Sequence, residues 1–185
     1  DGAADQLARL RPQPEPRLAP EGAEKFESDP DLKYMEPKER ERWLQVKRNF
    51  NNEPGFNVAH AKAFVKLRHQ LLLACQKGGV ELLLGSDAPQ ILNVPGFSIH
   101  HELKYLTDAG LNPYQALRTG TVNVAKFLGK KDSGAVRKGF DSDLVLLAGN
   151  PLENISNTRK IETVMIGTNL LSKEFIASEL KKLEK

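Results

Sequence analysis

Apolar residues recur at helical spacing across the middle of the chain. Between residues 58 and 77 they lie three or four positions apart and mark one apolar face, formed by Phe64, Leu67, Leu71 and Cys75. Gly78 and Gly79 are typical of a helix end, so we expect one helix over 58–77. The apolar run 80–84 follows directly and predicts a short buried strand. A helix that leads straight into a strand is typical of an α/β fold.

Other segments show the same two kinds of pattern. Helical spacing and capping residues predict further helices at 38–50, 99–108, 113–128 and 172–185. Short β-rich runs, separated by Gly, Asn and Pro, predict a small sheet from 134–136, 143–148 and 161–166. Prolines and a shortage of large apolar groups predict an extended loop over 1–35. The chain is thus expected to have four parts: 1–35, 36–132, 133–171 and 172–185.

Composition narrows the classes of protein that fit. A hydrophobic content of 39% and a charged content of 28% are typical of a soluble globular protein. The net charge of +3 is spread along the chain, so we expect no nucleic-acid groove. No apolar run reaches the roughly 18 residues that a membrane span needs, so we expect no membrane partner. The compartment stays open, because the chain begins at Asp1 and we expect the native start to lie upstream.

Cysteine chemistry is limited to one residue. Cys75 is the single cysteine of the chain, which excludes an internal disulfide framework and a cysteine-based zinc cluster. It lies within the apolar stretch 71–75, where we expect a buried and inert thiol.

The best candidate for chemistry is Asp87, in the sequence Gly-Ser-Asp-Ala-Pro at 85–89. A carboxylate placed where a buried strand ends is held by the sheet and points into solvent, as a metal ligand or proton-transfer group must. The alternative is a turn aspartate that only caps the next segment through its side chain.

Three stretches, taken in order, resemble the C-terminal part of the amidohydrolase superfamily. They are Leu83–Pro89, the run Gly96–Leu103 with 109–118 after it, and Gly134–Leu147 with Gly149–Leu152 after it. Within the superfamily the chain is most similar to imidazolonepropionases and prolidase-like dipeptidases. The resemblance covers about residues 58 to 171.

This resemblance implies a fold. The family has a (β/α)₈ barrel with a small β-sandwich formed by both ends of the chain. The expected fold class is therefore α/β: the last helix-strand-helix units of a barrel, part of a small β-sandwich and a C-terminal helix. Residues 36–132 would belong to the barrel, with 80–84 as its eighth strand, and residues 133–171 to the sandwich.

The resemblance also implies an activity. Asp87 matches the family's aspartate at the end of strand eight, which binds a catalytic divalent metal, expected here to be zinc, and exchanges a proton with the metal-bound water. The complete enzyme would hydrolyse a C–N amide bond in a small-molecule substrate, a dipeptide or a cyclic amide such as an imidazolone. His100 matches a histidine near the substrate mouth and is a candidate substrate contact; the alternative is a structural histidine at a helix start.

The chain departs from the family in its metal ligands. The family's His-x-His pair is missing, since the four histidines are His60, His69, His100 and His101. A complete barrel takes about 250 residues, more than this chain can supply. We therefore expect a fragment that is inactive alone, completed by an N-terminal half-barrel in the same chain or in a partner chain. Two further alternatives stay open, a homo-oligomer and a non-catalytic remnant that acts in packing or association.

Two other polar sites are expected to be structural. Ser86 precedes Asp87 but lacks the Gly-x-Ser-x-Gly elbow of serine hydrolases, so we expect a structural hydroxyl. The pair Arg159-Lys160 is expected to be solvated surface.

Overall fold

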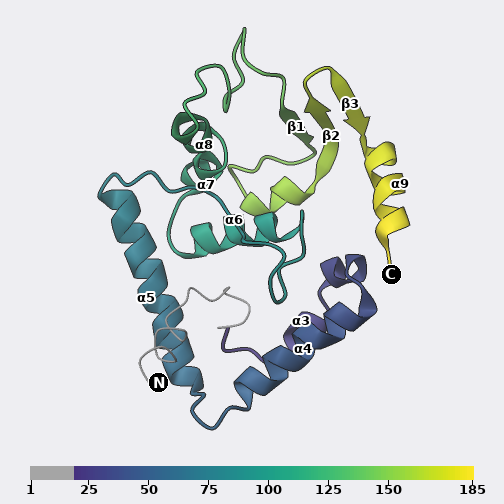
Figure 1. The fold of residues 1–185 in the computed structure, drawn as a ribbon. Helices are drawn as coiled ribbons and strands as arrows, with labels where there is room; N and C mark the ends of the chain where they lie inside the picture. The colour runs from purple at the N-terminus through teal and green to yellow at the C-terminus, as the bar shows by residue number, and fades with distance from the viewer. Residues whose placement is uncertain (1–18) are drawn as a thin grey trace.

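The computed structural model describes residues 19–185, which form a mixed α/β fold with one small antiparallel sheet (Figure 1). Residues 1–18, part of the expected N-terminal loop, lie outside the described residues. In Figure 1, α4 and α5 meet at the bottom of the molecule, α6 to α8 lie in the middle, and the sheet leads into α9 at one side. The elements, in order, are α3 (Glu24–Glu27), η1 (Pro30–Tyr34), α4 (Pro37–Asn51), α5 (Val58–Lys77), α6 (Ser98–Asp108), α7 (Pro113–Thr119), α8 (Val122–Phe127), β1 (Leu144–Leu147), η2 (Ile155–Arg159), β2 (Ile161–Ile166), β3 (Asn169–Ser172) and α9 (Lys173–Leu183).

Local capping signals place several helices where the sequence predicts them. Pro37 is the first residue of α4, where its missing N–H costs no helical hydrogen bond. The side chain of Asn57 accepts hydrogen bonds from the N–H groups of Ala59 and His60 at the start of α5. Ser172 accepts from Phe175 N–H in the same way at the start of α9. The predicted helices over 38–50, 58–77, 99–108 and 172–185 are confirmed.

The prediction of a single helix over 113–128 is wrong, because the structure has two helices there. The helical segment is interrupted at Gly120 and Thr121, which separate α7 from α8. The carbonyl of Thr119 accepts the N–H of Leu84 at 3.0 Å. A Cβ atom at Gly120 would lie 2.6 Å from the side chain of Leu84, so glycine permits this close approach. A contact with a distant segment therefore ends the helix.

The strand expected over 80–84 is also absent. The segment is extended, but in the described part of the chain it pairs with no strand. Leu82 and Leu84 are half-buried, whereas Val80 and Leu83 are 52% and 43% exposed. The alternation expected of a strand is thus present, and the neighbouring strands that would make a ladder are not among residues 19–185.

The observed sheet has three antiparallel strands in the order β1-β2-β3. Val145 pairs with Val164, which pairs in turn with Leu171. The runs expected at 143–148 and 161–166 are confirmed as β1 and β2. The strand expected at 134–136 is wrong, because Gly134 adopts a φ of 80°, and a Cβ atom there would lie 2.8 Å from the carbonyl oxygen of Thr121. The third strand is β3, which returns from β2 through a turn at Gly167.

Residues 24–27 and 30–34 are helical rather than extended, which corrects the expected loop. Asp29 caps η1 through a hydrogen bond from the N–H of Asp31 at 2.9 Å. Ala23 and Leu32 are buried against α4. Pro30 begins the 3₁₀ helix instead of breaking structure, because proline fits the first turn of a helix.

Apolar side chains gather in two clusters. The N-terminal cluster joins the α3–α4 region to the loop before α6 through Ala23, Leu32, Trp43, Leu44, Leu92 and Val94. The central cluster joins α6, α7 and η2 through Leu103, Leu106, Leu111, Ala116 and Ile155, with Leu82 and Leu84 packed against it. The stripe that predicted α5 lies largely outside both clusters: Phe64, Leu67 and Leu71 are 48%, 59% and 64% exposed, and Cys75 is half-buried.

Lys47 of α4 is fully buried beside the N-terminal cluster. Its Nζ donates a hydrogen bond to the carbonyl of Ala19 at 2.6 Å and lies 5.7 Å and 5.9 Å from the ring centres of Phe26 and Phe50. Burial lowers the pKa of Lys47 to about 8, and the carboxylates of Glu21 and Glu24 offset part of this effect.

We predict that Lys47 makes the free energy of unfolding rise with pH between about 8 and about 10.4, the pKa of an unfolded lysine. In that window the unfolded chain binds more protons than the folded chain. Below pH 8 Lys47 is protonated in both the folded and the unfolded chain. The folded chain then holds a buried ammonium group, and its desolvation lowers the free energy of unfolding by the full amount. Urea unfolding across this range should show the wild type gaining up to about 3 kcal/mol relative to Lys47→Met. If the free energy of unfolding changes with pH by the same amount in the wild type and in Lys47→Met, the lowered pKa of Lys47 is contradicted.

Candidate functional site

Asp87 lies at the end of the extended segment that follows α5. Its backbone has a φ of 54°, in the left-handed region that few non-glycine residues adopt. The side chain is exposed, and Gln90 Nε2 donates a hydrogen bond to its Oδ2. The sequence predicts an exposed carboxylate at this point, and the structure places one there.

Hydrogen bonds close the loop around Asp87. The amide of Asn93 donates to the carbonyl of Ser86 at 2.9 Å, and the N–H of Asn93 donates to the carbonyl of Gln90 at 2.8 Å. The hydroxyl of Ser98, at the start of α6, donates to Ser86 Oγ at 2.8 Å. Ser86 thus joins the loop to α6, in keeping with the structural role expected from its sequence.

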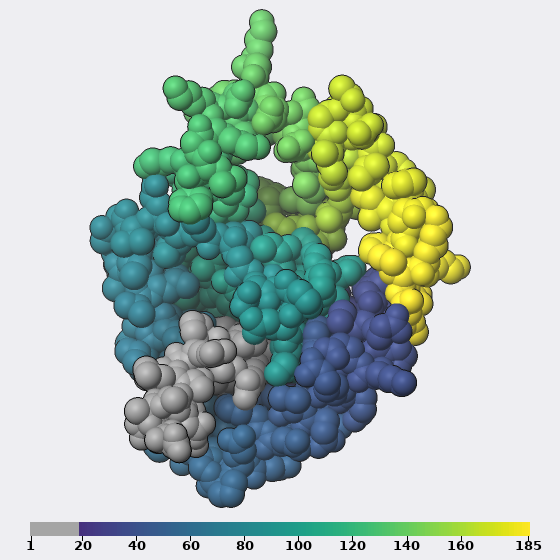
Figure 2. All heavy atoms as spheres, in the orientation of Figure 1, coloured from purple at the N-terminus to yellow at the C-terminus, as the bar shows by residue number. Residues whose placement is uncertain are grey.

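His100 faces a different part of the molecule. Its Nδ1 lies 3.0 Å from Thr158 Oγ1 on η2. Burial, followed by the positive charge of Arg159, lowers the pKa of His100 and so favours the neutral ring. Together with Thr158 it lines a mainly apolar cavity of about 390 Å³ beside β1 and the 133–136 segment. Figure 2 shows a hollow between residues of this region and the sheet. Asp87 is not among the described residues that line it.

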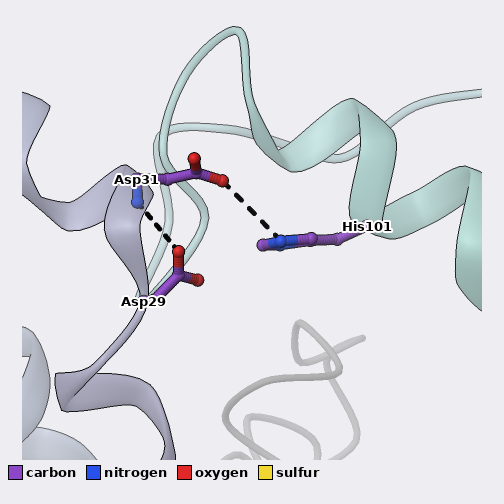
Figure 3. A group of neighbouring side chains, drawn as sticks. All are labelled: Asp29, Asp31 and His101. Atoms are coloured by element: carbon purple, nitrogen blue, oxygen red, sulfur yellow. Dashed lines mark hydrogen bonds and ion pairs between the residues drawn. The ribbon is translucent and has the colours of Figure 1, made fainter. Parts of the chain in front are cut away.

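Asp29, Asp31 and His101 form a group that sequence reasoning did not find (Figure 3). Each offers one ligand atom, and these atoms lie within 4.8 Å of one another. Such a group could hold a metal ion. Asp-Pro-Asp at 29–31 is a helix-start signal in the sequence, but nothing local indicates that His101 would lie beside it.

Arg159 neutralises this group. Its guanidinium donates to both carboxylate oxygens of Asp31, at 3.1 Å and 2.6 Å, and lies 2.9 Å from His101 Nε2. Asp31 raises the pKa of Arg159 through these hydrogen bonds. The expected exposure of Arg159 is confirmed, but its guanidinium is also paired with the carboxylate of Asp31. A metal ion here would have to displace the guanidinium, so the arrangement as it stands is an ion pair that ties η1 to α6 and η2.

Comparison with known families matches the amidohydrolase family over residues 57–171. The chain belongs to the amidohydrolase family. The match covers α5, the Asp87 loop, α6 to α8 and most of the sheet. It confirms the resemblance carried by the three sequence stretches.

Related sequences match over short lengths. An adenine deaminase of Bacillus subtilis is 39% identical over 61 residues, which is 33% of this chain and 10% of the deaminase. An ochratoxinase of Aspergillus niger is 32% identical over 82 residues, which is 43% of this chain and 16% of the ochratoxinase. The chain thus spans a small part of the length of these relatives.

Solved structures share the fold over most of this chain. A bottromycin amidohydrolase has a TM-score of 0.72 and 22% identity, covering 90% of this chain and 37% of its own. A Xaa-Pro dipeptidase with methionine in its active site has a TM-score of 0.50 and 21% identity, covering 81% of this chain and 31% of its own. Between residues 19 and 185, no helix is long and apolar enough to span a bilayer.

We predict that removing Arg159 destabilises the fold more than neutralising its partner does. Arg159→Met leaves the carboxylate of Asp31, 4% exposed, without its counter-charge, at a cost on the order of 3 kcal/mol. Asp31→Asn leaves a guanidinium whose side chain is 34% exposed, which water can solvate. Urea unfolding of both variants and of the double variant measures the order, and the double variant should be more stable than Arg159→Met. An Asp31→Asn variant that is the least stable of the three would contradict this prediction.

Proposed function

We propose that this chain is the C-terminal part of a metal-dependent hydrolase that cleaves a C–N amide bond, in which Asp87 is a metal ligand and proton shuttle. The observation that carries the proposal is the exposed Asp87 carboxylate, held on a closed loop inside the region that matches the family. Family membership supports hydrolysis; the role of Asp87 is our own assignment.

Asp87 is suited to be one of the ligands of a metal site. Carboxylate oxygens are good ligands for divalent metals, and Asp87 presents one outside the packed core. Within the described residues Asp87 belongs to no group of three possible ligands, so the remaining ligands must come from elsewhere. A bound divalent metal, zinc in our proposal, would supply a Lewis acid and acidify water at the site. Asp87 would contribute Oδ1 to the metal and accept and return a proton at its carboxylate.

For the substrate we propose a dipeptide or a cyclic amide. The names of the relatives, adenine deaminase and ochratoxinase, point to different compounds, so the proposal is based on the imidazolonepropionase- and prolidase-like motifs. We further propose that His100 contacts the substrate. In support, its ring lines a cavity of about 390 Å³ and is oriented by Thr158.

The proposed enzyme needs an N-terminal half-barrel, with 36–132 as barrel and 133–171 as sandwich. The exposed apolar stripe of α5 and the unpaired segment 80–84 support this, because both present surface that a neighbouring strand and helix would bury. The half-barrel could belong to the same polypeptide or to a partner chain. A non-catalytic scaffold is the second candidate, favoured by the absence of a complete ligand set among residues 19–185.

We predict that Asp87→Asn in the complete protein lowers kcat by at least about 100-fold, because amide nitrogen and oxygen replace the carboxylate that binds metal and carries the proton. Dipeptides and cyclic amides are the substrates to assay, with zinc content measured in parallel. The unfolding midpoint of the metal-free protein should stay unchanged, since Asp87 is exposed. Unaltered turnover in this variant would remove the proposed mechanism.

The intact mass of the polypeptide in its natural host tests the proposed half-barrel. A mass near twice the 20.6 kDa of this chain is expected if the missing half is covalently attached. A mass near 20.6 kDa together with a second, stably co-purifying chain would place the half-barrel in a partner. That mass without any such chain would favour the non-catalytic scaffold.

A further inference from the structure

The Asp87 carboxylate makes one side-chain hydrogen bond that its motif does not explain. Gln90 Nε2 donates to Oδ2, and Gln90 lies three residues after Asp87 in the loop. An uncharged amide donor orients a carboxylate without adding a cation that would compete with a metal ion. The contact occupies Oδ2 and leaves Oδ1 for other ligands.

Gln90 is itself on a fixed turn. Residues 90–93 form a tight turn closed by Gln90 and Asn93, and Leu92 adopts a φ of 63° within it. The side chain of Leu92 is 3% exposed and packs in the N-terminal cluster with Leu32, Trp43 and Leu44. A non-glycine residue keeps this backbone conformation only where its surroundings hold it. The N-terminal cluster therefore fixes the turn that carries Gln90.

The same turn is joined to the backbone next to Asp87. The side chain of Asn93 is 7% exposed, and its amide donates to the carbonyl of Ser86 at 2.9 Å. The loop is thus bound to the turn at two points, the carbonyl before Asp87 and the carboxylate of Asp87. The first bond fixes the backbone, and the second fixes the side-chain rotamer.

We propose that Gln90 is a positioning residue for Asp87, which holds the carboxylate in the orientation that presents Oδ1 to a metal ion. The proposal rests on the metal-ligand role of Asp87. Gln90 acts through Asp87 and does not itself bind the metal. Its place is set by the α3–α4 region through Leu92, so a segment outside the matched family region takes part in arranging the site.

Zinc affinity of the complete protein tests this directly, measured by competition with a chromophoric chelator. Gln90→Met keeps the approximate size of the side chain and removes the donor, and Gln90→Ala removes both. Both variants should bind zinc about 10- to 100-fold more weakly than the wild type, the usual effect of losing a residue that orients a ligand. Gln70→Ala, at an exposed glutamine of α5, is the matched control and should bind as the wild type does.

The unfolding midpoint of the metal-free protein separates positioning from folding. It should be the same in Gln90→Met and the wild type, because the lost hydrogen bond is exposed. Zinc affinity within twofold of the wild type in Gln90→Met would overturn the proposal, as would a weakening matched by loss of folded metal-free protein. If Asp87→Asn also binds zinc normally, the metal role of Asp87 has failed. If Asp87→Asn loses zinc and Gln90→Met does not, the role of Gln90 alone has failed.

Discussion

The burial of Leu92 and Val94 against Trp43 holds the loop on which the candidate site depends. Leu92 and Val94 are 3% and 4% exposed, and each such burial is worth roughly 1.5–3 kcal/mol. That exceeds the roughly 1 kcal/mol of a single loop hydrogen bond. At the other end of the loop, Leu82 and Leu84 pack against the central cluster. The backbone between the two clusters is therefore held at both ends, although Asp87 itself is exposed.

A partly buried ion pair between segments far apart in the chain fixes how those segments meet. Asp31 and Arg159 are 128 residues apart in the chain and join η1 to η2. A buried ion pair adds little net stability compared with apolar packing, but any arrangement that separates the two leaves Asp31 desolvated and unpaired. The pair therefore acts mainly against wrong placements of the N-terminal helices. His101 adds to this contact, since its Nε2 lies 2.9 Å from the same guanidinium.

The sequence predicts those features whose causes lie within a few residues. Pro37 and Ser172 mark helix starts that the structure confirms, since a cap acts on the next turn alone. The helix break at Gly120 depends on contact with Leu84, and the position of the Arg159 side chain depends on its ion pair with Asp31. Both contacts join segments far apart in the chain, so the residues near Gly120 and Arg159 do not predict them. For the site, sequence indicates Asp87 and its exposure. The contact of Asp87 with Gln90, and the group formed by Asp29, Asp31 and His101, became visible only in the three-dimensional structure.

The exposed stripe of α5 is the strongest physical sign of a larger assembly, and it does not depend on resemblance. Phe64, Leu67 and Leu71 keep the strict spacing of a buried helix face yet are about half to two-thirds exposed. In the segment that follows, Val80 and Leu83 are exposed, whereas Leu82 and Leu84 are half-buried against the central cluster. A helix and an extended segment that are consecutive in the chain thus both lack cover on their outer sides. Scattered surface apolar residues are common, but a periodic stripe on α5 followed at once by exposed Val80 and Leu83 makes a larger apolar surface than scatter explains. Within residues 19–185 the segment belongs to no β-ladder, although the N–H of Leu84 and the carbonyl of Leu82 are bonded to Thr119 and Asn123, so a neighbouring strand could still add a ladder beside it. The missing neighbour of residues 58–84 is therefore expected to supply a strand beside 80–84 together with apolar side chains against α5.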